Sequence, residues 1–323
     1  MTTGSGTERE LDPQIREFVA YLLGRSAELA GTDRLSYSER RRIAEEVRQP
    51  LAAGGPAIAA SRDYVVPAGT GDVKIRVINT SPGDRKAALV YLHGGGWMMF
   101  SLDTHDRIMR ELASRSGIAV VGVEYSLSPD VRYPVQLNEV QAIVRWLRAN
   151  DDAVGVDGSR LVIGGDSAGA NLAIASCLAL RAGSDLDGVL GLLLFYGVYD
   201  SRFDRNSYQR YADPAYLLSR DEMQDFWKCY TRSPDDYSDP LVSPLRADLS
   251  GLPPVRMIIA ERDVLHDENV EMAAKLRDSG VDVQSEVYRG TTHSFLEAIS
   301  MADVSRRALA DAADWLRQRA ENG

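Results

Sequence analysis

Cysteine and histidine are scarce in this chain, which has two cysteines and four histidines among its 323 residues. Two cysteines are too few for a disulfide framework, and Cys177 stands in an apolar helical stretch, where we expect a buried small hydrophobe. No group of these residues has the spacing of metal ligands. We therefore expect neither a metal nor another cofactor.

Positive charge and long apolar runs are also lacking. The chain has 37 Lys and Arg against 47 Asp and Glu, a net charge of −10. Nucleic acid and anionic membranes are bound by basic faces, so neither is an expected partner. No apolar run is long enough to span a bilayer, and the polar start at residues 1–6 lacks the apolar stretch of a signal peptide. We expect no stable membrane insertion and, by default, a cytoplasmic protein.

What the chain does contain is an alternation of short apolar runs with helical segments. Most of the runs are apolar throughout; they lie at 87–92, 118–123, 161–163, 189–195, 255–260 and 281–287. Helical patterns separate most of them, at 104–116, 134–150, 168–182 and 267–279, and a last helix is expected at 302–320. This alternation predicts an α/β protein with a parallel sheet covered by helices on both faces. Before it, 63–66 reads as a strand, and the alternating run 73–78 predicts a half-exposed antiparallel one.

Two stretches fall outside this alternation. Apolar residues at helical spacing predict a helix over 11–30, and a second helix begins after Ser36 and ends near Pro50. Residues 199–240 are polar and aromatic, with one credible helix from Ser219 to about Tyr230. Long insertions in α/β domains are usually functional. We interpret both stretches as parts of a lid.

A single G-x-S-x-G pattern, Gly165 to Gly169, stands between the apolar run 161–163 and a helix-forming run. Glycines two residues either side of Ser167 let strand and helix approach closely, so that the serine hydroxyl is exposed in a sharp turn. The alternative is a plain strand–helix turn. The context favours Ser167 as a nucleophile.

A nucleophilic serine needs a histidine base within hydrogen-bond reach. His93 ends a strand before three glycines, which suggests loop architecture, and His105 begins a helix, which suggests capping or a surface position. His266 also begins a helix. His293 lies in the loop after the last strand, at the same carboxyl edge of the sheet as Ser167, and is the expected base.

The base in turn needs an acid that fixes its tautomer. Asp263 lies in the loop after the run 255–260, and Glu261 is the fallback. Asp267 and Glu268 read as first-turn helix residues, where acids are common because of the helix dipole. The chain order of serine, then aspartate, then histidine is that of α/β-hydrolases.

The developing oxyanion needs amide donors, and the run His93-Gly94-Gly95-Gly96 follows the central strand 89–92. Consecutive glycines leave backbone N–H groups unshielded, able to converge on one oxygen together with the amide of Ala168. A nucleotide-phosphate loop would need a different spacing.

Four motifs together resemble the hormone-sensitive-lipase-like branch of α/β-hydrolases, which includes bacterial acetyl esterases and acetyl-hydrolases. They are His93 to Trp97, Gly165 to Ala173, Asp263 to Asp267 and His293 to Phe295. The resemblance runs from about residue 62 to the C-terminus. It implies an α/β-hydrolase fold with an eight-stranded, mostly parallel sheet and a helical cap.

The resemblance also implies the domain organisation and the roles in the site. Residues 1–55 would be an N-terminal helical cap segment, and 56–323 the catalytic domain with a cap insertion at about 200–240. Ser167 would be the nucleophile, His293 the base and Asp263 the orienting acid. The oxyanion hole would comprise Gly94, Gly95, Gly96 and Ala168, with Gly94 shaping the loop.

The chain departs from the family pattern at two places. The segment 124–130 replaces a usual Asp-Tyr-Arg-Leu-Ala-Pro-Glu run, and Phe100 stands where glycine is common. We hypothesise that the bulk of Phe100 narrows the pocket and favours small acyl groups. The candidate pocket residues are Trp97, Met98, Phe100, Asp166, Tyr196, Leu217, Phe226 and Phe295.

The expected function is that of a serine hydrolase that cleaves short-chain, acetyl-type carboxylic esters through an acyl-enzyme. The partner would be a small ester or acetylated molecule. Removal of an acetyl group from an amide or a specialised metabolite is an alternative on the same triad, and a lyase, a dehydratase or a small-ligand receptor on the same fold is another. A homodimer is possible through an exposed edge strand at 281–287.

Overall fold

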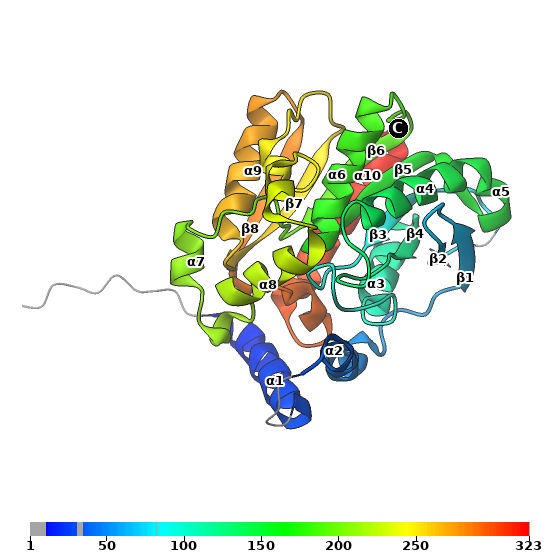
Figure 1. Ribbon diagram of the computed structural model, residues 1–323. Helices are drawn as coiled ribbons and strands as arrows, with labels where there is room; N and C mark the ends of the chain where they lie inside the picture. The colour runs from blue at the N-terminus through cyan, green and yellow to red at the C-terminus, as the bar shows by residue number, and fades with distance from the viewer. Residues whose placement is uncertain (1–10, 31–34, 82, 323) are drawn as a thin grey trace, which may run out of the picture.

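The computed structural model describes residues 11–30, 35–81 and 83–322, and its centre is one eight-stranded sheet (Figure 1). The strand order is β1-β2-β4-β3-β5-β6-β7-β8. β1 pairs with β2 and β2 with β4 in antiparallel fashion, and all other neighbours are parallel. The strands are β1 Ala60–Pro67, β2 Asp72–Asn79, β3 Lys86–Leu92, β4 Ala119–Glu124, β5 Val156–Asp166, β6 Val189–Phe195, β7 Val255–Arg262 and β8 Val283–Thr292. The predicted mostly parallel sheet is confirmed.

Helices cover both faces of the sheet, because residues that alternate along a central strand enter two different apolar clusters. In β3, Ala88, Val90 and Leu92 belong to one cluster, and Ala87, Leu89 and Tyr91 to the other. The first cluster packs against α4 Val135–Ala149, α6 Ala168–Ala182 and α9 His266–Asp278; the second packs against α3 Asp106–Ser116 and α10 Asp303–Asn322. A short α5, Asp151–Val154, precedes β5.

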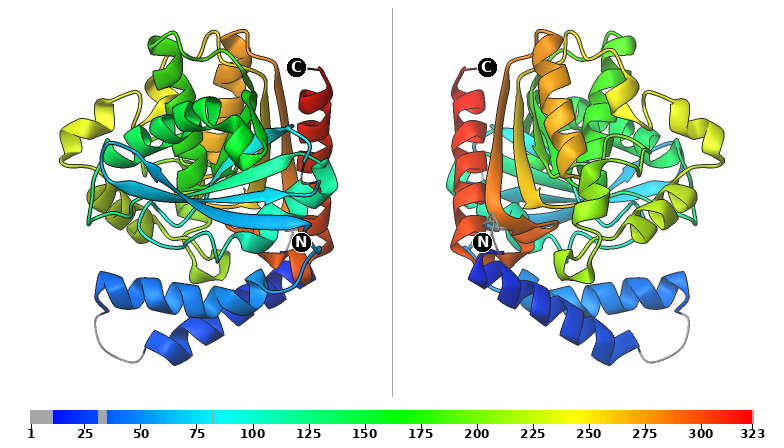
Figure 2. Two further views of the ribbon diagram at one scale, coloured as in Figure 1. Left: turned by 90° about the vertical axis from the view of Figure 1, so that its right-hand side faces the viewer. Right: turned by 90° about the vertical axis from the view of Figure 1, so that its left-hand side faces the viewer.

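The two N-terminal helices form a separate layer beyond one edge of the sheet (Figure 2). α1 spans Pro13–Ala30 and α2 spans Tyr37–Ala52, with the predicted capping box at Ser36 and Glu39. α2 ends at Ala52, two residues after Pro50, near which its end was expected. Proline removes only one N–H from the last turn, and Leu51 is buried in the second cluster, so the helix continues.

The insertion after β6 holds more structure than the one helix expected. α8, Arg220–Tyr230, begins at the predicted capping box of Ser219 and Glu222. The other elements are α7 Asn206–Arg210, η1 Pro214–Tyr216, η2 Pro234–Ser238 and η3 Pro244–Arg246, and η4 Phe295–Ser300 follows β8. Such short turns leave no helical periodicity to detect in a sequence.

Candidate active site

Ser167 sits in a strained turn between β5 and α6, with φ 54° and ψ −117°. A non-glycine residue with positive φ stores backbone strain, which packing around it must offset. A Cβ on Gly165 or Gly169 would overlap the carbonyl oxygen of Leu92 in β3. Glycine at both positions is therefore required for the close approach of β3, as the sequence pattern predicted.

The structure brings Ser167, His293 and Asp263 together in one row. His293 Nε2 lies 2.9 Å from Ser167 Oγ, and His293 Nδ1 lies 2.7 Å from Asp263 Oδ2. An ionised carboxylate can only accept, so Nδ1 carries the proton and Nε2 is free to accept from the serine hydroxyl. All three side chains are buried, and Leu265 N–H donates to Asp263 Oδ1 at 2.9 Å.

Opposing effects act on the imidazole of His293. Burial lowers its pKa, but the charge of Asp263 and the hydrogen bond to it outweigh burial, with further contributions from Asp166 and Glu297. The pKa of His293 is consequently raised above 6.5. The carboxylate thus stabilises the protonated imidazole that serine attack would produce.

The glycine loop after β3 lies beside Ser167. Gly95 and Gly96 have φ of 100° and 61°, line the same cavity as Ser167, and have amides without a hydrogen-bond partner in the described part of the chain. Ala168 begins α6, where backbone N–H groups point out of the helix end. Gly94 differs, because its N–H donates to Asp166 Oδ1 at 3.0 Å. Gly94 was expected to shape the loop of the oxyanion hole and not to donate to the oxyanion, and its N–H is bonded to Asp166.

Asp166 lies behind the glycine loop rather than in the pocket where we expected it. It accepts from Tyr91 Oη at 2.7 Å, and His105 Nε2 lies 3.4 Å away. His105 is fully buried, so the expected surface role is wrong. Burial lowers the pKa of His105, but Asp166 raises it by more, whereas burial and the neighbouring His105 lower the pKa of His93 to about 3.

A cavity of about 360 Å³ opens above Ser167 and His293. Phe100, Leu217 and Phe226 line it, as expected from the sequence. The rest of its wall includes residues from the two N-terminal helices and the glycine loop that the pocket prediction missed: Leu22, Leu23, Ser26, Ala30, Ile43, Ala44, Arg48 and Met99. Only the apolar stripe of α1 and α2 hinted at them, and a stripe does not say what it faces.

The other expected pocket residues lie outside this lining. Trp97 stacks on Tyr230, with ring centroids 4.1 Å apart, and Met98 is buried in the core. Tyr196 meets the ring of His293 edge-on at 5.0 Å, and Phe295 packs on Tyr196. Large side chains next to a motif are as useful for supporting it as for touching a ligand, and the sequence does not separate the two.

Within the described ranges, no helix combines the length and apolarity needed to cross a bilayer, and no group of three or more His, Cys, Asp or Glu side chains is arranged to hold a metal ion.

Comparison with known protein families gives one match, to a model described as the alpha/beta hydrolase fold, over residues 89–297. Among curated proteins, an ethyl acetate hydrolase of Pseudomonas putida is 37% identical over 233 residues, which cover 72% of this chain and 73% of the relative. An acetyl esterase of Salmonella paratyphi B is 36% identical over 261 residues, 80% of each chain.

Solved structures agree with these sequence relatives. A hyperthermophilic esterase from the archaeon Pyrobaculum calidifontis superposes with a TM-score of 0.90 at 31% identity, over 96% of this chain and 99% of that one. A thermostable esterase from Pseudomonas putida gives 0.89 at 29% identity, over 98% and 99%.

Proposed function

This chain belongs to the α/β-hydrolase fold family, in its hormone-sensitive-lipase-like branch, and is a carboxylic-ester hydrolase; we propose that Ser167, His293 and Asp263 are its catalytic triad and small acetyl-type esters its substrates. The observation that carries the proposal is the continuous pair of contacts from Ser167 Oγ through the imidazole to Asp263. The names of the relatives support the substrate class.

The reaction begins when His293 Nε2 takes the proton of Ser167 as its oxygen attacks the ester carbonyl. The amides of Gly95, Gly96 and Ala168 donate to the oxyanion; one such donor is worth roughly 2.7–4 kcal/mol of barrier in serine hydrolases. The imidazolium then protonates the leaving alcohol, and an acyl-enzyme remains on Ser167. Water, activated by the same imidazole, releases the acid.

We extend the proposal to the cap and to the size of the acyl group. Residues of α1, α2 and the insertion line the cavity, which supports a cap made from residues 1–55 and 200–240. Phe100 also lines it, its ring 2.7 Å from where a Cβ on Gly95 would stand. Because the aromatic ring lies this close to a proposed oxyanion donor, it limits the space for the acyl group and favours short acyl chains.

The test of the triad is covalent labelling by a fluorophosphonate, together with hydrolysis of p-nitrophenyl acetate. Both should occur in the wild type and disappear in a folded Ser167→Ala variant. A folded wild type that is neither labelled nor active would support the receptor alternative. Hydrolysis that survives Ser167→Ala would remove this mechanism.

We further propose that the protein forms a homodimer through the edge strand β8. Gln284, Glu286 and Val287 are exposed there, and among the described residues β8 is the last strand of the sheet, paired with β7. Light scattering of the wild type and of Val287→Lys, which places a charge on that edge, checks this. A monomeric wild type would contradict it. The cytoplasmic location stays a prediction, which cell fractionation tests.

A further inference from the structure

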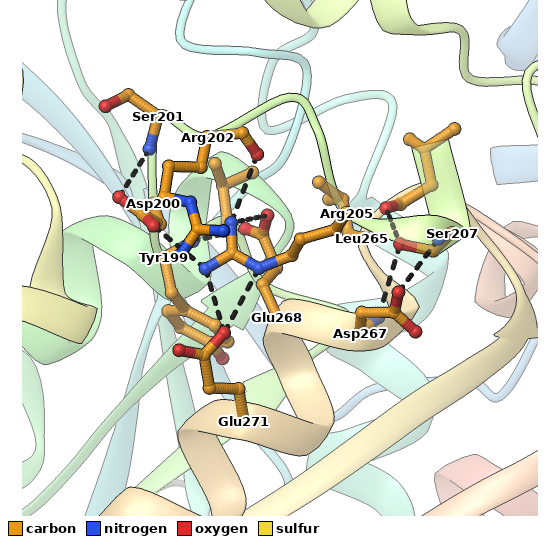
Figure 3. A network of polar contacts seen from close by, with 12 residues as sticks. Tyr199, Asp200, Ser201, Arg202, Arg205, Ser207, Leu265, Asp267, Glu268 and Glu271 are labelled. Atoms are coloured by element: carbon orange, nitrogen blue, oxygen red, sulfur yellow. Dashed lines mark hydrogen bonds and ion pairs between the residues drawn. The ribbon is translucent and has the colours of Figure 1, made fainter. Parts of the chain in front are cut away.

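Arg205 and Ser207, in the insertion, are buried and do not belong to the lining of the cavity. They lie beside Leu265 and the first turns of α9 (Figure 3). The proposed reaction assigns neither of them a role. Their contacts nevertheless converge on residues 264–271, which comprise the turn after β7 and the first turns of α9.

Ser207 holds this turn at two points. Its hydroxyl donates to the carbonyl oxygen of Val264 at 2.6 Å, and its backbone N–H donates to Asp267 Oδ2 at 2.8 Å. Val264 directly follows Asp263, and the hydroxyl bond is buried. A shift of this turn would move the Asp263 carboxylate relative to His293 Nδ1, so the two bonds restrict that movement.

Arg205 supplies positive charge to the first turns of α9. Its Nη2 lies 2.9 Å from Glu271 Oε2 and 2.8 Å from Asp200 Oδ2, and its Nη1 lies 4.0 Å from Glu268 Oε2. Glu268 is fully buried, and its Oε2 has no hydrogen-bond partner in the described chain. A buried carboxylate of this kind is costly unless a cation lies nearby. Burial raises the pKa of Glu268 well above its usual value, although the hydrogen bond from Tyr199 N–H and the charge of Arg205 oppose this rise.

The same helical turn contacts the nucleophile side of the site. Glu268 Oε1 accepts from Tyr199 N–H at 2.7 Å, and the side chain of Asn269 bonds both the N–H and the carbonyl of Gly197. Between them, Val198 N–H donates to the carbonyl oxygen of Ser167 at 3.3 Å. The start of α9 therefore spans the acid and the nucleophile, and the insertion fastens it.

Resting on the proposed triad, we propose that Ser207 and Arg205 are positioning residues for the catalytic acid Asp263. The cap insertion then holds the triad in register in addition to covering the cavity.

The first experiment compares Ser207→Ala with Ser207→Thr, which keeps the hydroxyl. Rates are normalised to the amount of active enzyme by fluorophosphonate titration. Ser207→Ala should lower kcat about tenfold, because small misplacements of catalytic groups have costs of this order or larger, and leave KM unchanged. Ser207→Thr should retain most of the kcat.

The acid limb of the pH profile distinguishes positioning from general loosening. Three carboxylates raise the pKa of His293: Asp263 in the turn after β7, Asp166 at the end of β5 and Glu297 in η4. If Asp263 is less well placed, the midpoint of the acid limb moves to lower pH. The matched control is Ser243→Ala, because Ser243 is also buried and its hydroxyl also donates to a carbonyl, that of Tyr237, away from the triad. This control should lose stability without moving the midpoint.

The second experiment tests the charge. Arg205→Met should lower kcat by a similar factor, and Glu268→Gln in the same background should restore part of it, since a neutral amide still accepts from Tyr199 N–H and needs no cation. An unchanged kcat and midpoint in Ser207→Ala, or the same shift in Ser243→Ala, would overturn the proposal even if Arg205→Met fails to fold. Loss of the proposed function itself is separate, because it would appear as an unlabelled, inactive wild type.

Discussion

The nucleophile and the acid of the proposed triad lie at the same edge of the sheet but are held in different ways. Backbone geometry places Ser167: its positive φ, the glycines two residues on either side and the carbonyl of Leu92 leave little freedom. Side-chain hydrogen bonds place Asp263: the turn after β7 is tied through Ser207, and the carboxylate itself through Leu265 and His293.

The difference matters because the two kinds of restraint fail differently. A packed backbone turn has few alternative conformations. A substitution there therefore lowers the free energy of unfolding, and the catalytic geometry changes only when the packing gives way. A side chain held by hydrogen bonds can be replaced by one of nearly the same shape. The variant then folds normally but presents a donor to its partner where the original side chain presented an acceptor. Substitutions near Asp263 should thus lower activity without lowering stability, and substitutions near Ser167 should lower both.

The largest expected effect is that of Asp263→Asn. An amide of nearly the same shape would present an N–H to His293 Nδ1 and favour the wrong imidazole tautomer, and in serine hydrolases this substitution lowers kcat about 10⁴-fold. We expect a loss of that order on p-nitrophenyl acetate with a melting temperature close to that of the wild type. Steady-state kinetics and thermal unfolding on the same preparations measure both.

The acid's fallback in the sequence, Glu261, provides the matched comparison for this prediction. Its carboxylate accepts from Gly290 N–H at 2.7 Å and lies 3.6 Å from Arg262 Nε. Glu261→Gln should keep most of the activity. If Glu261→Gln inactivates the enzyme and Asp263→Asn does not, the acid has been misassigned.

The next effect is that of Gly169→Ala, on the backbone side. A methyl group would overlap the carbonyl oxygens of Leu92 and His93, so that β3 and α6 must separate. We expect a loss of at least about 4 kcal/mol in the free energy of unfolding, the range reached when a core contact cannot relax. Chemical denaturation measures it.

Gly183→Ala, at the C-cap of the same helix, is the control. Gly183 has φ −85°, and an added Cβ would have its nearest contacts at 3.6 Å, so alanine fits there. The variant should be as stable as the wild type or slightly more so. Equal losses at Gly169 and Gly183 would show that close approach of β3 is not what selects glycine at 169.

This contrast also explains which parts of the molecule the sequence predicted. A Cβ on Gly165 or Gly169 would overlap β3, and Gly95 and Gly96 have positive φ, so glycine is required at these positions and leaves a pattern in the sequence. The apolar runs predicted the strands because a strand of a parallel sheet that is covered on both faces is apolar throughout. His105, which we expected to cap a helix or lie at the surface, is buried at the N-cap of α3 without a side-chain capping bond; its side chain lies near Asp166, and nothing near His105 in the chain indicates that partner.

The cavity wall was predicted least well. It combines side chains of α1, α2, the glycine loop and the insertion, and which faces of these elements meet is decided by tertiary packing. Trp97 and Phe100 stand three residues apart after the same motif, yet one supports the cap and the other lines the cavity. Periodicity shows that a residue is buried without showing what it is buried against.

The pH dependence of kcat/KM tests the hydrogen bond between Asp263 and His293, and its expected effect is smaller. His293 must be neutral to accept the serine proton, and its pKa is raised, so kcat/KM should fall about tenfold per pH unit below a midpoint above 6.5. The linkage has the opposite sign for folding. A raised pKa in the folded state stabilises the protein fully below the unfolded value and loses that contribution as pH rises through the folded value.

A pH–rate profile between pH 5 and 9 measures the midpoint, and a flat profile would contradict the role of His293 as base. In Asp263→Asn the largest contribution that raises the pKa of His293 is gone, while Asp166 and Glu297 still raise this pKa and burial still lowers it. The residual activity of that variant should therefore have its acid limb at lower pH than that of the wild type.

The smallest expected effect is a difference in stability between two variants at Phe100, where the backbone conformation favours glycine and packing favours the aromatic ring. Its φ of 75° favours glycine, yet its ring lines the cavity and carries the guanidinium of Arg48 at 4.0 Å. Removing the ring loses packing in both Phe100→Ala and Phe100→Gly, by roughly 3–5 kcal/mol. Only glycine relieves the strained φ, so Phe100→Gly should be more stable than Phe100→Ala by about 1 kcal/mol, the reverse of the usual order.

Both variants should hydrolyse p-nitrophenyl octanoate better, relative to acetate, than the wild type does. Denaturation and a chain-length series on the two variants separate the effects: an alanine variant more stable than the glycine variant would mean that the backbone imposes no cost here, and an unchanged chain-length preference would mean that the ring does not limit the acyl group.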